Sequence, residues 1–274
     1  MSGTAWVNGK FIDQSIPCLR IQDRGFLYGD GLFETMRLHE GQVLCWDQHL
    51  ARLSAGCAAL KINFPLEEVT SGVEETAAEL KNGVLRLTLS RGESARGLLP
   101  PRDSKATIVI TGSTGEPYPE DAYKKGFRTC LISFPRSHLS PLVQLKSLNC
   151  LENILGRLEV AAAGVEEGLF CNYLGEIAEG TTSNVFLVME GRLITPPPEC
   201  GLLPGIMRAQ VISLASRQGI TITEEKLYPE DFSRAEEAFL TNSLLGIMPL
   251  VSFEGKPVGD GCPGPLTEML RSKI

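Results

Sequence analysis

Two stretches of the chain indicate its fold and its chemistry: residues 144–149, QLKSLN, and residues 175–186, GEIAEGTTSNVF. The first sets Lys146 after an apolar run and just before a predicted helix. The second places Glu179 between an alanine and a glycine, in a segment of small and β-branched residues that is typical of a strand. A lysine and a carboxylate in these settings are candidate reactive groups.

Pyridoxal phosphate enzymes need such a pair. A partly desolvated lysine presents a neutral, nucleophilic amine near neutral pH, which forms a Schiff base with the cofactor aldehyde. A carboxylate among small residues can be approached closely by a flat ring, and it keeps the pyridine nitrogen protonated so that the ring absorbs electrons. The pattern therefore suggests these roles for Lys146 and Glu179. Taken singly, the pattern favours an ordinary surface lysine and a turn-edge glutamate.

The composition predicts a globular protein with room for two domains. Of 274 residues, 43% are hydrophobic and 22% are charged, which is enough apolar content for sizeable cores. No apolar run approaches the roughly 18 residues of a membrane helix, and the start, MSGTAW, lacks the features of a signal peptide. We therefore expect neither a membrane span nor a leader. The net charge of −7 argues against a nucleic-acid partner.

The cysteines and histidines predict no metal site. The eight cysteines include no C-x-x-C pair, and the three histidines are dispersed. This usage is typical of a reduced, cytoplasmic protein whose cysteines are mostly small core residues.

The pattern of strands and helices predicts an α/β (α+β) fold with two domains. Strands are expected at 5–7 and 10–12 around the turn pair Asn8-Gly9, at 34–38 and 42–46 around Glu40-Gly41, and at 84–89 and 106–110. Asp47 is expected to cap a helix. The apolar stripe of that helix consists of Leu50, Leu53, Cys57 and Leu60.

Residues 112–121 are rich in glycine, proline and polar residues, and they mark the domain boundary. We expect a small N-terminal α/β domain at 1–115, a linker at 116–124 and a larger C-terminal domain at 125–274. Beyond the boundary, strands are expected at 127–134, 168–173, 183–189, 192–195, 238–240 and 250–253, and helices after Lys146 and from about 207 to 219. The first of these helices places four apolar residues on one face: Leu151, Ile154, Leu155 and Leu158.

Further segments are candidates for binding an anion. The helix after Leu203-Pro204-Gly205 would present free backbone amides, which form a ready phosphate site. Arg52 lies off the apolar stripe of its helix, and Thr241-Asn242-Ser243 offers hydroxyl groups at the end of a buried strand. The glycine-rich loop at 23–35 is not a G-x-G-x-x-G motif, and no dinucleotide fold is expected.

Together these segments resemble the fold-type IV pyridoxal phosphate enzymes, which include branched-chain and D-amino acid aminotransferases and aminodeoxychorismate lyase. The resemblance covers essentially the whole chain, and it implies a site at the domain junction and a homodimer. It also implies roles for individual residues. Lys146 matches the Schiff-base lysine, Glu179 the pyridine partner and Arg52 the phosphate-binding arginine, while Ile206, Met207 and Ser243 match the phosphate cup.

Four features favour the lyase within this group. Branched-chain aminotransferases usually carry Gly-Thr-Ala where this chain has Asn242-Ser243-Leu244, and a tyrosine where it has Asn149-Cys150. D-amino acid aminotransferases typically have an Arg-x-His pair, whereas residues 91–98, RGESARGL, contain no histidine. Thr35 falls where the lyases place a substrate-facing hydroxyl, so the resemblance implies a catalytic role for it.

The expected reaction converts 4-amino-4-deoxychorismate into 4-aminobenzoate and pyruvate, a step of folate biosynthesis. The two carboxylates of this substrate need cations or amide donors, for which Arg91, Arg96 and Asn242 are candidates, with solvated loop positions as the alternative for the arginines. The rival interpretations are an aminotransferase acting on D-amino acids or branched-chain amino acids, and a non-catalytic relative retained for binding.

Overall fold

A computed structural model of the chain describes residues 4–101 and 103–274. It forms two compact units, of which the first is Met1–Pro117 with Leu145–Asn149 and the second is Tyr118–Gln144 with Cys150–Ile274. Both units mix helices and strands, which confirms the α/β class. Residues 1–3, where the chain was expected to carry no leader, lie outside the described range. Two details differ from the expected division: Lys146 belongs to the first unit, and most of the expected linker is helical.

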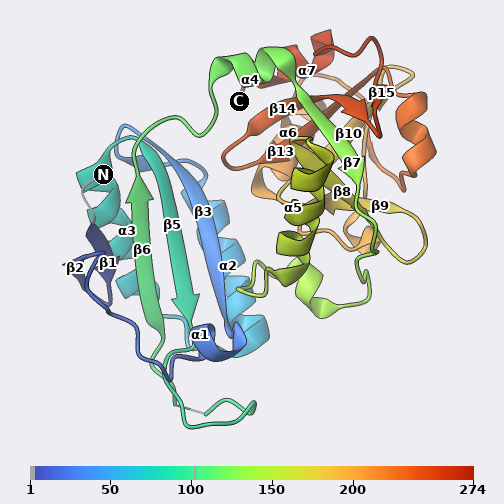
Figure 1. Ribbon diagram of the computed structural model, residues 1–274. Coiled ribbons are helices and arrows are strands. Elements are labelled where there is room, and N and C mark those ends of the chain that lie inside the picture. The colour runs from blue at the N-terminus through green and yellow to red at the C-terminus, as the bar shows by residue number, and fades with distance from the viewer. Residues whose placement is uncertain (1–3, 102) are drawn as a thin grey trace. The chain divides into compact units, whose positions relative to one another are not determined.

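The first unit is an antiparallel sheet covered on one face by two helices (Figure 1). The strands are ordered β2-β1-β6-β5-β3-β4, and every neighbouring pair is antiparallel. Its elements are β1 (Thr4–Val7), β2 (Lys10–Asp13), α1 (Arg24–Tyr28), β3 (Gly31–His39), β4 (Gln42–Val43), α2 (Trp46–Leu60), α3 (Leu66–Leu80), β5 (Gly83–Ser90) and β6 (Thr107–Ser113).

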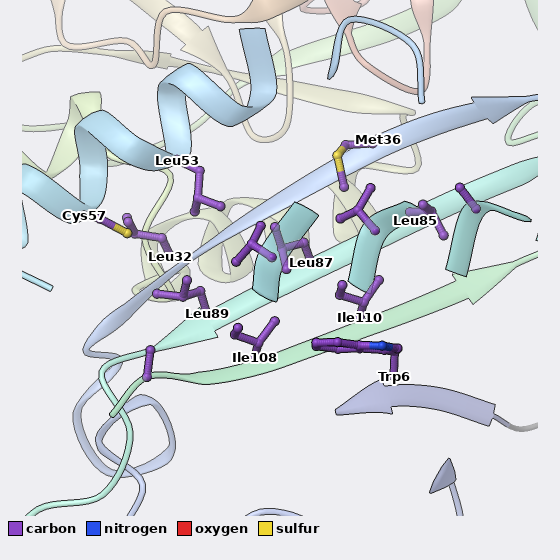
Figure 2. Packing of buried hydrophobic residues seen from close by; sticks show 14 of the residues in the cluster. Trp6, Leu32, Met36, Leu53, Cys57, Leu85, Leu87, Leu89, Ile108 and Ile110 are labelled. Carbon is purple, nitrogen blue, oxygen red and sulfur yellow. The ribbon is translucent and has the colours of Figure 1, made fainter. Parts of the chain in front are cut away.

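Alternation along the strands builds the core of the first unit. Every second side chain of β3, β5 and β6 points toward α2 and α3, because successive strand residues face opposite sides of a sheet. Figure 2 shows these side chains meeting Leu53 and Cys57 from α2, and Trp6 from β1. The predicted apolar stripe of α2 is confirmed, since its members are buried or packed against this cluster. The opposite face of the sheet carries side chains that are more exposed, among them Phe33, Thr35 and Arg86.

The turns of the first unit follow local chemistry. Asn8 and Gly9 take φ angles of 46° and 95°, which confirms the tight hairpin between β1 and β2. The expected cap at Asp47 is wrong. Cys45 precedes the helix in a left-handed conformation, with φ at 56°, and Asp47 lies inside the first helical turn. There its carboxylate still faces the positive end of the helix dipole.

The second unit is built on a mixed nine-stranded sheet (Figure 1). The strand order is β12-β11-β10-β13-β14-β7-β8-β9, and β15 pairs with β14. Its elements are α4 (Glu120–Lys125), β7 (Phe127–Leu131), η1 (Pro141–Gln144), α5 (Leu151–Ala163), β8 (Glu167–Cys171), β9 (Ile177–Gly180), β10 (Asn184–Met189), β11 (Arg192–Thr195), η2 (Pro198–Cys200), α6 (Ile206–Arg217), β12 (Ile222–Glu224), η3 (Pro229–Ser233), β13 (Glu237–Asn242), β14 (Gly246–Phe253), β15 (Lys256–Pro257) and α7 (Pro265–Arg271).

Helix α5 packs on its sheet with its small residues. Gly156 and Val160 are its buried positions, and a Cβ at Gly156 would lie 2.8 Å from the ring of Phe170. The four large apolar residues that the sequence places on one face instead remain 52–74% exposed: Leu151, Ile154, Leu155 and Leu158. The helix therefore presents an apolar stripe that the described part of the single chain leaves uncovered.

Two kinds of feature are absent from the described residues. None of the helices in residues 4–101 and 103–274 is long and apolar enough to span a membrane. The same ranges hold no group of three or more His, Cys, Asp or Glu side chains that could bind a metal ion.

Candidate functional site

Lys146 is held against the start of β3 in the first unit. The backbone N–H of Phe33 donates to Lys146 O at 2.9 Å, and that of Leu148 donates to Gly31 O at 3.0 Å. The segment thus extends the sheet as a short antiparallel addition. Lys146 Nζ lies 4.4 Å from the centroid of the Phe33 ring, so backbone pairing and a ring contact together fix where the amine points.

Thr35 and Arg86 share the sheet face that carries Phe33. Phe33 and Thr35 are two residues apart on β3 and therefore point to the same side. Arg86 stands directly opposite Thr35 in the register of β3 and β5, and its Cζ lies 4.0 Å from the centroid of the Phe33 ring. This face gathers an amine, a hydroxyl and an exposed guanidinium around one aromatic ring. Arg86 was not among the residues predicted from the sequence, although it is the one charged residue in the strand at 84–89.

Arg52 is fixed by a buried carboxylate. Glu34, which is 1% exposed, accepts from Arg52 Nε at 2.8 Å and from Nη2 at 2.6 Å, and His49 Nδ1 lies 2.7 Å from its Oε2. Burial would raise the pKa of Glu34, but hydrogen bonds from Arg52 and His49 outweigh it and lower that pKa below its usual value. The two-point pair orients the guanidinium, so Arg52 suits a fixed anion rather than solvent.

Arg91 is buried in a hydrogen-bond network inside the first unit, and the substrate contact expected for it stays a prediction. It is 4% exposed, and its Nε and Nη2 donate to the two oxygens of Asp30 at 2.8 and 3.0 Å. Its remaining contacts are with backbone oxygens of Leu60 and Lys61 at the end of α2. Four of its donor contacts are thus internal, and they tie α2 to the start of β3.

Hydrogen bonds from the buried Arg24 hold the loop that carries Arg96. Arg24 donates to Asp30 Oδ2 at 2.7 Å and to the backbone oxygens of Gly97 and Leu98 at 2.8 and 2.7 Å. Arg96 itself is exposed on this loop. Its contact with substrate stays a prediction, while the anchored backbone gives the loop a defined shape.

Glu179 lies on β9 in the second unit and is held at both oxygens. It is 6% exposed; Arg136 donates to its Oε1, and the backbone N–H of Leu203 donates to its Oε2 at 3.1 Å. A cation that donates to one oxygen and a backbone N–H that donates to the other both stabilise the charge of a buried carboxylate. The geometry fits the expected partner of a protonated ring nitrogen.

A second buried glutamate shapes the loop that follows β9. Glu167, on β8, accepts from the backbone N–H groups of Thr181 and Thr182 at 3.2 Å each and from the hydroxyl of Ser183 at 3.0 Å. The hydroxyl groups of both threonines also donate to it. Glu167 thus fixes the backbone next to Glu179, a role that a lone glutamate at a strand start does not reveal in sequence.

The start of α6 has the features of an anion site. Gly205 precedes the helix in an extended conformation, and a Cβ there would lie 2.1 Å from Asn184 Oδ1, so the loop closes against that side chain as only glycine allows. The first N–H groups of a helix, here those of Ile206 and Met207, have no partner within the helix. They are therefore available to a phosphate group, which the helix dipole also favours.

Thr241 supports a ligand at this position. Its side chain is 1% exposed, and its Oγ1 has no hydrogen-bond partner among the described residues. Thr241 shares a strand face with Phe239, whose ring packs in the cluster that α6 covers. Ser243 follows in the turn after β13. A buried hydroxyl without a partner is costly unless something else accepts its hydrogen, so the surroundings of α6 fit a bound phosphate group.

Asn242 shapes the end of β13. Its Oδ1 accepts from the N–H groups of Leu244 and Leu245 at 2.8 and 2.7 Å, and its Nδ2 donates to Thr182 O at 3.0 Å. One N–H of the amide remains beyond these contacts, so a substrate contact through it stays a prediction. The predicted residues thus fall into two groups. The first unit contains Lys146, Thr35, Arg52, Arg91 and Arg96, and the second contains Glu179, Ile206, Met207, Asn242 and Ser243.

Comparisons with known proteins identify relatives along nearly the whole chain. The family model for amino-transferase class IV matches residues 31–253. A protein of Methanocaldococcus jannaschii, provisionally named a branched-chain-amino-acid aminotransferase, is 35% identical over 98% of this chain and 94% of its own. The aminodeoxychorismate lyase of Bacillus subtilis is 31% identical over 91% and 86%. The D-alanine aminotransferase of Bacillus licheniformis is 28% identical over 97% and 94%.

Solved structures show the same fold. The 4-amino-4-deoxychorismate lyase of Pseudomonas aeruginosa superposes with a TM-score of 0.88 at 32% identity, covering 98% of this chain and 97% of the other. The branched-chain amino acid aminotransferase of Escherichia coli gives a TM-score of 0.93 at 25% identity over 99% and 93%. A further branched-chain aminotransferase structure, also 25% identical, was solved with pyridoxamine 5′-phosphate. Structures of both activities therefore share the fold of this chain.

Proposed function

Because the chain belongs to the amino-transferase class IV family, whose cofactor is pyridoxal 5′-phosphate, we propose that it converts 4-amino-4-deoxychorismate into 4-aminobenzoate and pyruvate. The similarity to two lyases above 30% identity supports this reaction. The observation that carries the proposal is the face around Phe33, where Lys146, the hydroxyl-bearing Thr35 and Arg86 are gathered. These groups match a substrate that must lose a proton and that carries carboxylates.

The residues that would hold the cofactor are Lys146 at the aldehyde, Glu179 at the ring nitrogen, and Arg52, Ile206, Met207 and Ser243 at the phosphate. When bound, the cofactor supplies an electron sink conjugated to the amino nitrogen of the substrate. The residues of the proposed site come from each of the two compact units, Met1–Pro117 with Leu145–Asn149 and Tyr118–Gln144 with Cys150–Ile274. Its pre-formed parts are the Arg52–Glu34 pair, the α6 amides and the doubly held Glu179.

Lys146 moves the proton in this reaction. Its amine takes the proton from the ring carbon that bears the amino nitrogen, and the enolpyruvyl ether leaves from the neighbouring carbon as the ring becomes aromatic. The proton then passes to the methylene carbon of the departing enolpyruvyl group, which gives pyruvate. Thr35 lies on the same face as the ring that Lys146 contacts, so its hydroxyl can orient the leaving group or relay the proton.

Arg86 is the cation that the first unit offers to a substrate carboxylate. It is exposed, it faces Thr35, and its planar group rests on Phe33. The planar guanidinium of an arginine suits two-point binding of a carboxylate. Arg96 is the second candidate on the anchored loop.

A coupled assay tests the lyase proposal. Enzymatically generated 4-amino-4-deoxychorismate is supplied to purified protein, and 4-aminobenzoate is followed by its fluorescence. We expect rapid product formation that is abolished in Lys146→Ala and reduced in Thr35→Ala, with pyruvate formed in equal amount. If the protein shows the absorbance of lysine-bound cofactor but forms no 4-aminobenzoate, the proposed lyase activity is wrong.

The second candidate is an aminotransferase for branched-chain or D-amino acids. The 35% identity to the Methanocaldococcus jannaschii protein favours it, and the same lysine and glutamate suffice for amino transfer. Amino transfer from leucine or D-alanine to 2-oxoglutarate would identify this activity. A non-catalytic relative would show neither reaction and no lysine-bound cofactor.

We also propose that the chain forms a homodimer in the cytoplasm and that its apolar stripe on α5 is covered by the second copy. The stripe consists of Leu151, Ile154, Leu155 and Leu158, all more than half exposed in the single chain. Contiguous apolar surface of this kind marks an interaction site on a soluble protein. A small-molecule substrate, and neither nucleic acid nor membrane, is the expected ligand of the site.

A further inference from the structure

We propose that Arg136 is a positioning residue for Glu179, which it keeps ionised and correctly turned so that the proton shared with a bound pyridine ring stays on the ring nitrogen. The inference rests on the proposed function, because it assumes that Glu179 faces that nitrogen. It adds a residue to which the sequence assigned no role.

The contact is direct and buried. Arg136 is 4% exposed and donates through Nη1 to Glu179 Oε1, while the backbone N–H of Leu203 takes the other oxygen at 3.1 Å. With one donor on each oxygen, the carboxylate cannot rotate about its last bond without losing a hydrogen bond. Contacts within the protein therefore fix the plane of the Glu179 carboxylate, and with it the direction from which a ring N–H can donate to Glu179.

Arg136 is itself fixed before any ligand arrives. Its Cζ lies 4.2 Å from the centroid of the Phe170 ring, and its Nε lies 3.3 Å from Glu152 Oε2. Its backbone N–H donates to Cys171 O at 2.8 Å, which ties the segment to the end of β8. The cation cannot swing away from Glu179 without leaving the aromatic ring, and this makes the arrangement pre-organised.

The charge of Arg136 determines where the shared proton resides. A carboxylate taken out of water favours its neutral, protonated form, because burial penalises the charge. A cation in contact reverses that preference. With Arg136 present, Glu179 is the weaker base of the pair and the pyridine nitrogen keeps the proton. Without Arg136, the proton shifts toward Glu179 and the ring loses the positive charge that makes it an electron sink.

A purely structural role is the alternative, since a buried arginine also stabilises the fold around it. Two ligands separate the two roles. Pyridoxal 5′-phosphate has the ring nitrogen, whereas its 1-deaza analogue has a carbon there and is otherwise the same shape. A structural defect weakens both ligands alike, but loss of control over the shared proton weakens only the ligand that has the nitrogen.

The experiment measures dissociation constants of both ligands for the apoprotein, by equilibrium dialysis, in wild type, Arg136→Met, Arg136→Lys and Arg128→Met. We expect Arg136→Met to weaken pyridoxal 5′-phosphate about tenfold, the equivalent of one pKa unit, and to leave the deaza analogue nearly unchanged. Arg136→Lys should recover part of the loss. Arg128→Met makes the same change at an exposed arginine of the second unit, which pairs with Glu166, and it should change neither constant.

A ¹⁵N label in the cofactor ring gives an independent readout. We expect the ¹⁵N shift of a protonated ring nitrogen in wild type and a move toward the unprotonated value in Arg136→Met. Equal weakening of both ligands, or an unmoved ¹⁵N shift, would overturn the proposal. Wild type that binds both ligands equally tightly would remove Glu179 as the ring partner and the proposal with it. Failure of the lyase assay alone would leave these binding results standing, so the two failures are distinguishable.

Discussion

Glu34 accepts a hydrogen bond from Arg52 at each of its carboxylate oxygens: Arg52 Nε donates to Oε1 at 2.8 Å, and Nη2 donates to Oε2 at 2.6 Å. The pair joins β3 to α2 inside the first unit, and His49 adds a contact to the same carboxylate. Removing one partner of a buried pair leaves the other charge uncompensated, which is far more costly than the pair is worth in isolation.

The first prediction concerns the pH dependence of this pair. The pKa of Glu34 is lowered in the folded protein. The stability that its ionised form contributes is therefore fully present above the ordinary pKa of 4.5, and it is lost as the pH falls through the pKa of the folded state. Glu34→Gln should lower the free energy of unfolding by about 3 kcal/mol at pH 7. Urea unfolding at pH 7 and in acid measures this. The difference in unfolding free energy between wild type and Glu34→Gln should become smaller in acid, and a larger difference there would contradict the prediction.

The second prediction separates Arg91 from the substrate. Because Arg91 is buried and paired with Asp30, Arg91→Met should lower the free energy of unfolding by about 3–5 kcal/mol. The KM of folded variant protein, assayed at low temperature, should stay near the wild-type value. Urea unfolding and steady-state kinetics measure the two effects. A raised KM with unchanged stability would restore the substrate contact expected from the sequence.

The third prediction is the converse result for Arg86. Its guanidinium is exposed and rests on Phe33, so Arg86→Met should change the free energy of unfolding by no more than about 0.5 kcal/mol. The KM should rise about tenfold or more, because a charge-assisted hydrogen bond to a carboxylate contributes about 1.5–3 kcal/mol. Arg86→Lys keeps the charge but loses the planar guanidinium, so its KM should lie between those of wild type and Arg86→Met. An unchanged KM in Arg86→Met would exclude Arg86 from the site.

Features that depend on neighbouring residues were predictable from the sequence. The hairpin at Asn8-Gly9 and the apolar stripe of α2 each follow from a few consecutive residues, and the structure confirms both. Helix α3 has the same kind of signal, since Val69, Val73 and Ala77 recur at helical spacing and are buried. That helix was nevertheless not among the predicted elements.

Features that depend on long-range pairing were not predictable. Arg91 meets Asp30 from 61 positions away, and Arg86 meets Phe33 only because of the register between β3 and β5. A single sequence does not reveal that register, so it could not show that Arg91 is buried and paired whereas Arg86 is exposed beside Phe33. The stripe on α5 shows the same limit, because periodicity identifies an apolar face but not what covers it.

The fourth prediction tests that stripe as a contact between two copies. Leu155→Glu places a charge at its centre, and we expect the dimer to dissociate to a monomer of the 29.8 kDa chain mass in sedimentation equilibrium. Ala163→Glu is the matched control, because Ala163 is exposed on another side of the same helix and should leave the dimer intact. Wild type that is monomeric, or Leu155→Glu that remains dimeric, would contradict the assignment.

The fifth prediction concerns the turn that leads into α6. A Cβ at position 205 would lie 2.1 Å from Asn184 Oδ1, and Asn184 is itself buried and bonded to Leu203 O at 3.0 Å, so it has little room to move. In Gly205→Ala the backbone must shift, and the amides of Ile206 and Met207 would then turn away from the phosphate position. We expect the affinity for pyridoxal 5′-phosphate to fall about tenfold, the equivalent of roughly 1.4 kcal/mol. Equilibrium dialysis of the apoprotein measures this, with Ser216→Ala at the other, exposed end of α6 as the control. Wild-type affinity in Gly205→Ala would show that the phosphate group binds elsewhere.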